Sequence, residues 1–184
     1  MDHLNYTTTG LKRFIDAQNL VYSSVLAELQ AGKKETHWMW YIFPQLEILG
    51  NSEPSKYFGI RDADEAIAYL NNPLLFARLT ECIEIVRYES VEQRRLIRYI
   101  IHHDGPKLVS SVTLFCRVAI NADEVRFATF IQLCEELLQE AFEQGLRPCE
   151  VTQKFIPLKI LDPDQLVGRF RINSLRTYES PWVR

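Results

Sequence analysis

The residues best able to do chemistry in this 184-residue chain lie in two short polar clusters. The first contains Lys34, His37 and Gln45, with Trp38 and Trp40 between them. Histidine exchanges protons near neutral pH, lysine neutralises anions, and tryptophan rings offer flat faces for stacking. One hypothesis is that the aromatic rings wall a pocket into which the polar groups point. The alternative is an aromatic core helix whose histidine and tryptophan nitrogens are all hydrogen-bonded.

The second cluster is His102-His103-Asp104 with Lys107, Ser110 and Ser111. On a helix the lysine and the two serines share a face, because they are spaced three and four residues apart. A lysine and two hydroxyls near a helix start, where backbone N–H groups point outward, suit an anion or a phosphate. The alternative is that the serines pack between helices and the lysine is solvated.

The sequence offers little support for a metal site, for a serine nucleophile or for a glycine-rich phosphate-binding loop. His102 and His103 are adjacent rather than four residues apart, so they do not form the chelating pair of a helix. The chain contains no G-x-S-x-G elbow, no phosphate-binding P-loop and no G-x-G-x-x-G motif. The four cysteines are scattered and contain no C-x-x-C pair, which predicts free thiols: Cys82, Cys116, Cys134 and Cys149. We therefore expect neither a metal nor a cofactor.

Apolar residues recur at helical spacing along most of the chain, and these helices must position the two clusters. The clearest patterns cover residues 11–18, 21–32, 74–88 and 123–144. The run 107–120 contains many β-branched residues, but its length favours a buried helix. Capping residues mark three further helix starts: Asp62 with Glu65, Asn72 with Pro73, and Ser90 with Gln93.

Helices this dense, joined by short loops, predict an all-α fold: a single orthogonal helical domain of about seven or eight helices. We place the domain in residues 1–156. Residues 157–184 have weak periodicity and several prolines, which indicates an irregular C-terminal extension or tail. Within it, Asp162-Pro163 is a candidate start for one short helix.

Composition narrows the class of protein. Hydrophobic residues make up 47% and charged residues 24%, with a formal net charge of −3, which is typical of a soluble globular domain. A chain without a basic excess is not expected to bind nucleic acid generically. The N-terminal sequence lacks the apolar segment of a signal peptide, and no apolar run approaches the ~20 residues of a membrane span. These features predict a cytoplasmic protein that does not contact membranes.

Several segments together resemble a family of small bacterial proteins of unknown function that often carry the label calpastatin. The matching segments are LKRFIDAQ, VYSSVLAELQAGKK, HWMWYIFPQL, LGNSEPSKYFGI, DEAIAYLNNPLL and DGPKLVSSVTLF. The resemblance covers about residues 10–156, and HWMW-x-x-FPQ is its most specific motif. It implies an all-helical fold and no particular activity. Nothing in the chain resembles the disordered, repeat-containing inhibitor of that name.

Two functional hypotheses follow. In the first, His37 and Lys107 face one cavity as catalytic residues, and a small anionic or nucleotide-like ligand binds there. Its ligand-binding residues would be Lys34, Trp38, Trp40, Gln45, Tyr57, Asp104, Ser110 and Ser111. A faint likeness to helical proteins that process ADP-ribose-linked compounds makes N-glycosidic hydrolysis the reaction class to test, on association alone. In the second, the protein is a non-enzymatic helical interaction protein with an exposed apolar patch on the helix over 123–144. No oligomeric state is predicted.

Overall fold

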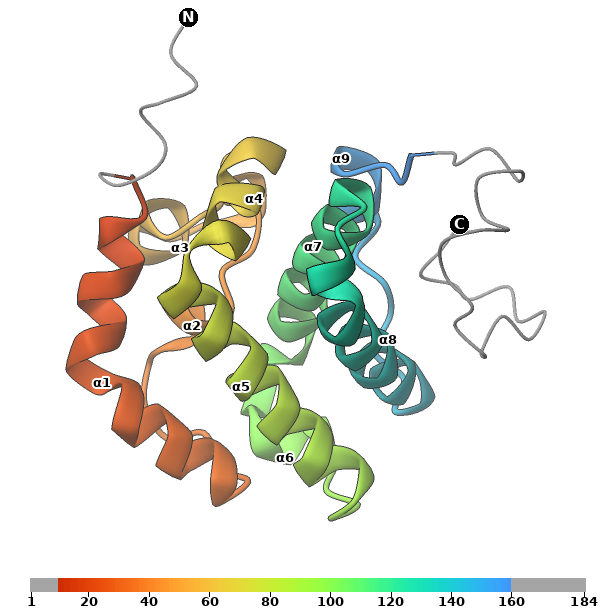
Figure 1. Cartoon of the computed structure of the whole chain (residues 1–184). Coiled ribbons are helices and arrows are strands. Elements are labelled where there is room, and N and C mark those ends of the chain that lie inside the picture. Colours follow the sequence, from red (N-terminus) through yellow and green to blue (C-terminus); the bar gives the residue numbers. More distant parts are fainter. Residues whose placement is uncertain (1–9, 160–184) are drawn as a thin grey trace, which may run out of the picture.

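The computed structural model describes residues 10–159, and within this range the secondary structure is helical apart from one isolated bridge between Leu46 and Ile60 (Figure 1). The α-helices are α1 Lys12–Gln30, α2 Met39–Ile42, α3 Glu53–Tyr57, α4 Ala63–Asn71, α5 Pro73–Val91, α6 Ile97–Ile100, α7 Gly105–Ala122, α8 Ala128–Glu143 and α9 Glu150–Phe155. Short 3₁₀-helices are η2 Glu47–Leu49, η3 His102–Asp104 and η4 Val125–Phe127.

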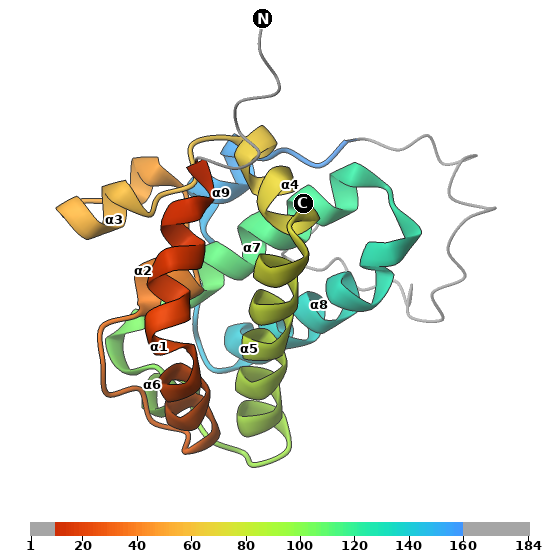
Figure 2. The same ribbon diagram turned by 60° about the vertical axis from the view of Figure 1, so that its left-hand side comes forward.

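The predicted all-α fold is confirmed. Helix α5 lies between α1 on one side and the α7–α8 pair on the other (Figure 1). In the turned view, α1 and α5 run side by side while α7 and α8 run across their direction (Figure 2). The helices enclose one core, whose largest fully buried side chains include Trp38, Tyr69, Phe14 and Phe115. The described part holds slightly more helices than expected because α2, α3 and α6 are very short.

The long periodic segments are helical, although the helix expected from residue 123 begins only at Ala128, after η4. The two stretches 11–18 and 21–32 form the single helix α1, and Gly32, with a left-handed backbone (φ +67°), follows its end. The ambiguous run 107–120 lies within α7, and this helix is buried at every position from Leu108 to Ala119. Burial on all sides explains its uninterrupted apolar sequence, which otherwise resembles a strand.

Two of the three predicted caps are correct. The Asn72 side chain accepts hydrogen bonds from the N–H groups of Leu74 and Leu75, both at 3.1 Å, and so caps α5. Asp62 accepts from the Glu65 N–H at 2.8 Å and caps α4. The third prediction is wrong, because Ser90 lies inside α5. Its hydroxyl is buried and accepts a hydrogen bond at 2.9 Å from Gln144, beyond α8, instead of capping a new helix.

The described segment continues a few residues past α9 and rests on α7. Arg117 donates to the carbonyl of Ile156 at 2.6 Å, and Asn121 donates to that of Pro157 at 2.9 Å. The predicted short helix at Asp162-Pro163 lies outside the described residues, and the boundary after residue 156 stays a prediction. All four cysteines carry free thiols. Among the described helices, none combines the length and apolar character of a membrane span.

Candidate functional site

A cavity of about 250 Å³ lies where the loop after α1 meets η3 and the start of α7. We call it the Asp104 cavity. The backbone N–H of Lys34 donates to the Ile100 carbonyl at 2.7 Å, which fixes the loop against the end of α6. Its lining residues are Lys34, His37, Met39, Trp40, His102, His103, Asp104 and Lys107. The structure thus brings part of each sequence cluster to one place, and it puts His37 and Lys107 in the same cavity.

Asp104 joins the two lysines of the cavity. Its carboxylate oxygens lie 2.9 Å from the Lys34 ammonium and 2.6 Å from that of Lys107. Burial alone would raise the pKa of Asp104, but hydrogen bonds and charge from the two lysines outweigh it and lower this pKa. The carboxylate therefore stays ionised. Two cations face one anion, so this group of three carries one net positive charge even before any histidine is protonated.

The two tryptophans of the motif have different surroundings. The Trp40 ring lines the cavity and is nearly parallel to the His37 ring, with an angle of 17° and centroids 6.4 Å apart. Lys107 Nζ lies 6.0 Å from the same Trp40 ring. Trp38 is instead fully buried, and Lys34 Nζ lies 5.4 Å from its ring. Trp40 therefore forms the aromatic wall of the Asp104 cavity, whereas the buried Trp38 ring lies next to the Lys34 ammonium on the interior side.

Glu28, on the last turns of α1, holds the loop that carries Lys34 and His37. Its carboxylate accepts hydrogen bonds from the Glu35 N–H at 2.7 Å, the Thr36 hydroxyl at 2.6 Å and the Trp38 indole N–H at 2.7 Å. Burial opposes ionisation of Glu28, but these donors lower its pKa below the ordinary value. No sequence pattern indicates this arrangement, since Glu28 is one of many acidic residues predicted on helices.

Several predicted ligand-binding residues lie away from the Asp104 cavity. Ser110 is buried and shares a hydrogen bond of 3.1 Å with Thr152 of α9, and Ser111 is completely buried inside the α7 packing. Gln45 is half-buried, and its carbonyl accepts from the Ile60 N–H at 2.9 Å in the isolated bridge. For the serines the alternative of packing between helices is the correct one, because α7 is already buried all round where they occur.

Two residues of the cavity belong to the second sequence cluster but were not among the predicted ligand-binding residues. His102 and His103 both line it, beside Asp104. Within residues 10–159, no three His, Cys, Asp or Glu side chains are placed to share a metal ion. The sequence signal that could have assigned His102 and His103 to the cavity is their position directly before Asp104. All three residues lie in the tight 3₁₀ turn η3, and the two histidines reach the same cavity as Asp104.

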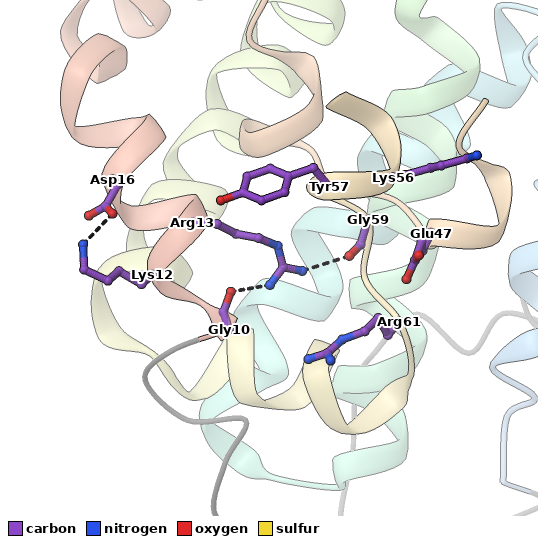
Figure 3. Close-up of a pocket in the computed structure, with 9 residues that line it drawn as sticks. All are labelled: Gly10, Lys12, Arg13, Asp16, Glu47, Lys56, Tyr57, Gly59 and Arg61. Carbon is purple, nitrogen blue, oxygen red and sulfur yellow. Dashed lines mark hydrogen bonds and ion pairs between the residues drawn. The ribbon is translucent and has the colours of Figure 1, made fainter. Parts of the chain in front are cut away.

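A second cavity, of about 410 Å³, lies between the start of α1 and the loop after α3 (Figure 3). Tyr57 belongs here rather than to the Asp104 cavity. Four cations, Lys12, Arg13, Lys56 and Arg61, line this cavity together with the carboxylates of Asp16 and Glu47. Arg13 and Arg61 contact the buried carboxylate of Glu65 at 2.8 and 3.1 Å, and Lys12 pairs with the nearby Asp16. Arg13 also donates to backbone carbonyls on either side, so its role is to join α1 to the loop.

The outward surface of α8 bears on the hypothesis of an interaction protein. That hypothesis expected an exposed apolar patch on this helix. The exposed positions of α8 are instead polar: Thr129, Gln132, Glu135, Glu136, Gln139 and Glu143. Of the large hydrophobic residues that the described segment exposes, the nearest in sequence is Val125, in η4 just before α8. The surface of this helix therefore does not favour the interaction hypothesis.

Comparisons with known proteins identify relatives without a known activity. A family model described as "Protein of unknown function (DUF1810)" matches residues 8–142. A crystal structure of the conserved hypothetical protein Rv1873 from Mycobacterium tuberculosis is similar, with 39% sequence identity and a TM-score of 0.68. The match covers 81% of this chain and 97% of the mycobacterial chain. No curated protein matches the chain.

Proposed function

Because the chain belongs to the DUF1810 family, whose members are described only as proteins of unknown function, we propose a function from the geometry of the Asp104 cavity. The cavity binds a small anionic, nucleotide-like ligand. The observation that carries this proposal is the convergence of Lys34 and Lys107 on the single carboxylate of Asp104. Half-buried lysines with an unbalanced charge attract an anion, and a phosphate offers more acceptor oxygens than one carboxylate can.

The aromatic side of the cavity supports a ligand that contains a planar ring. Trp40 and His37 present nearly parallel rings beside Lys107, so a base could stack there while its phosphate reaches the lysine. The volume of about 250 Å³ lies just below the range of roughly 300–1,000 Å³ that is usual for drug-sized ligands. A mononucleotide or a smaller phosphate ester fits this size better than a dinucleotide.

The proposal is tested by calorimetric titration of three anions: adenosine 5′-monophosphate, ribose 5-phosphate and inorganic phosphate. We expect the nucleotide to bind most tightly, because base stacking contributes about 1–3 kcal/mol. Lys107→Ala and His37→Ala should each weaken binding about tenfold or more, which corresponds to about 1.4 kcal/mol. His37 is exposed, so its removal should change the melting temperature little.

Lys33→Ala is the matched control. It removes the same charge one residue from Lys34, but Lys33 is exposed and pairs only with Glu35 in the described structure. Its affinity for all three anions should equal that of the unmodified protein. The proposal fails if the unmodified protein binds none of the anions, or if Lys33→Ala weakens binding as much as Lys107→Ala does.

The reaction class to test at this site is hydrolysis of an N-glycosidic bond. Water would add to the anomeric carbon, the bond to the ring nitrogen would break, and His37 would give a proton to the departing base and regain the proton that the water loses. Lys107 would hold the phosphate. Incubation with adenosine 5′-monophosphate and with ADP-ribose-linked compounds, followed by chromatography for released base, measures this directly. Release that His37→Ala abolishes supports an enzyme, whereas binding without release indicates a non-catalytic ligand-binding protein.

A further inference from the structure

Within residues 10–159, the helices α1, α6, α7 and α8 are each followed by a residue in the left-handed backbone region. After α1 this residue is Gly32 (φ +67°), and after α8 it is Gly145 (φ +87°). After α6, whose last capping residue is Ile101, it is His102 (φ +51°). Glycine is the usual residue at this position because it has no Cβ to clash with the backbone. Two of these four positions therefore carry a side chain, His102 after α6 and Asp123 after α7 (φ +53°), and His102 is the one of the two that lines the Asp104 cavity.

The space available for a side chain does not explain why some of these positions have glycine and others do not. A Cβ at Gly32 would lie 1.9 Å from the Arg95 side chain, so glycine is needed there for room as well as for conformation. A Cβ at Gly145 would meet no atom within 4 Å, and yet that position also has glycine. A left-handed conformation is strained for a residue with a side chain, although histidine tolerates it better than most. Strain of this kind is characteristically kept where the side chain is needed.

The side chain of His102 lines the Asp104 cavity. It follows α6 at the point where the chain turns into η3, two residues before Asp104. We propose that His102 is a ligand-binding residue of this cavity, whose imidazole N–H donates a hydrogen bond to the ligand that Lys34 and Lys107 attract. This inference rests on the proposed function, because it concerns the same anionic ligand.

The test compares stability with affinity in a single variant. His102→Gly removes the imidazole and also removes the backbone strain. We expect its melting temperature to equal or exceed that of the unmodified protein, while its affinity for adenosine 5′-monophosphate falls about fivefold or more. A residue with a purely structural role would not gain stability and lose affinity together. A second measurement is the NMR signal of the His102 ring protons, identified by their loss in the variant, which should shift when the nucleotide is added.

Arg94→Gly is the matched control, because Arg94 is another non-glycine residue in the left-handed region (φ +53°) and is exposed. It should behave like His102→Gly in stability and like the unmodified protein in affinity. The inference is overturned if His102→Gly binds the nucleotide normally while Lys107→Ala does not. That result would leave the proposed function intact. If the unmodified protein binds none of the three anions, the inference and the proposed function fail together.

Discussion

Ionised carboxylates in this protein are held by several donors at once. Glu65 is fully buried, yet its pKa is lowered. Burial alone would raise that pKa, but hydrogen bonds from Arg13 and Arg61 and the charge of Arg13 outweigh it. The backbone N–H of Arg61 also donates to Glu65 at 2.9 Å. Such a group contributes to stability only while every partner is present, because an unpaired charge in the interior is costly.

We predict that Glu65→Gln destabilises the protein strongly. The amide cannot balance the charge of Arg13, whose side chain is only 12% exposed, and its NH₂ group would face other donors. Removing one partner of a buried ion pair costs about 3–5 kcal/mol, and the partial exposure of Arg61 places the expected loss at the lower end. Urea unfolding measures the change. Glu47→Gln is the control. Glu47 is exposed and lines the cavity that Arg13 and Arg61 also line, and this variant should unfold like the unmodified protein.

Single residues also show how far the sequence alone could predict the site. Residue types and spacing were enough to predict that His37 and Lys107 line one cavity, because both sequence clusters combine polar groups with apolar neighbours. They could not separate Trp38 from Trp40. Trp38 is buried with its indole N–H donating to Glu28, a residue ten positions earlier on α1. No periodic pattern encodes such a contact, since it arises only when the loop folds back on α1.

Helix boundaries in this molecule follow local signals where the helix end is exposed and tertiary contacts where it is buried. Asn72 and Asp62 cap helices that begin near the surface, and both were predictable from sequence. Ser90 looked like a third cap, but packing against α8 and the hydrogen bond with Gln144 keep this residue helical. Capping patterns compete with burial, and a buried serine with an interhelical partner has little reason to end a helix.

We predict that Asn72→Ala lowers the free energy of unfolding by about 1 kcal/mol, because two N–H groups at the start of α5 lose their acceptor. Helix α5 lies between α1 and α8, so fraying of its first turn weakens the packing of the whole core. Thermal or urea unfolding gives the value. Asn72→Asp keeps an accepting oxygen at the helix start and should restore most of the loss. Equal losses for both variants would show that packing, not capping, sets the stability at this position.

At the scale of the whole molecule, three carboxylates add to the apolar packing that attaches α1 and the loop after it to the rest. Glu28 binds the loop to α1 itself, and Glu65 joins α4 to Arg13 of α1. Asp104 joins η3 to Lys34 of the loop. In Figure 1, α1 forms one side of the molecule, so these contacts supplement its packing on α5 at an outer layer. The same loop carries half of the proposed site, which makes the site and this attachment depend on the same charges.

This arrangement predicts a loss of stability in acid. The pKa values of Glu28, Glu65 and Asp104 are all lower in the folded protein than their ordinary values of 4.5, 4.5 and 3.8. A carboxylate with a lowered folded pKa stabilises fully above its unfolded pKa, and this contribution disappears as the pH falls through the folded pKa. Urea unfolding should therefore give similar free energies at about pH 7 and 5, and a steep fall from about pH 4 to 3. In Asp104→Asn, which lacks one of the three groups, the fall should be shallower. A free energy of unfolding that stays constant down to about pH 3 would mean that folding does not lower the pKa values of these carboxylates. The attachment of α1 would then rest on its packing rather than on these charges.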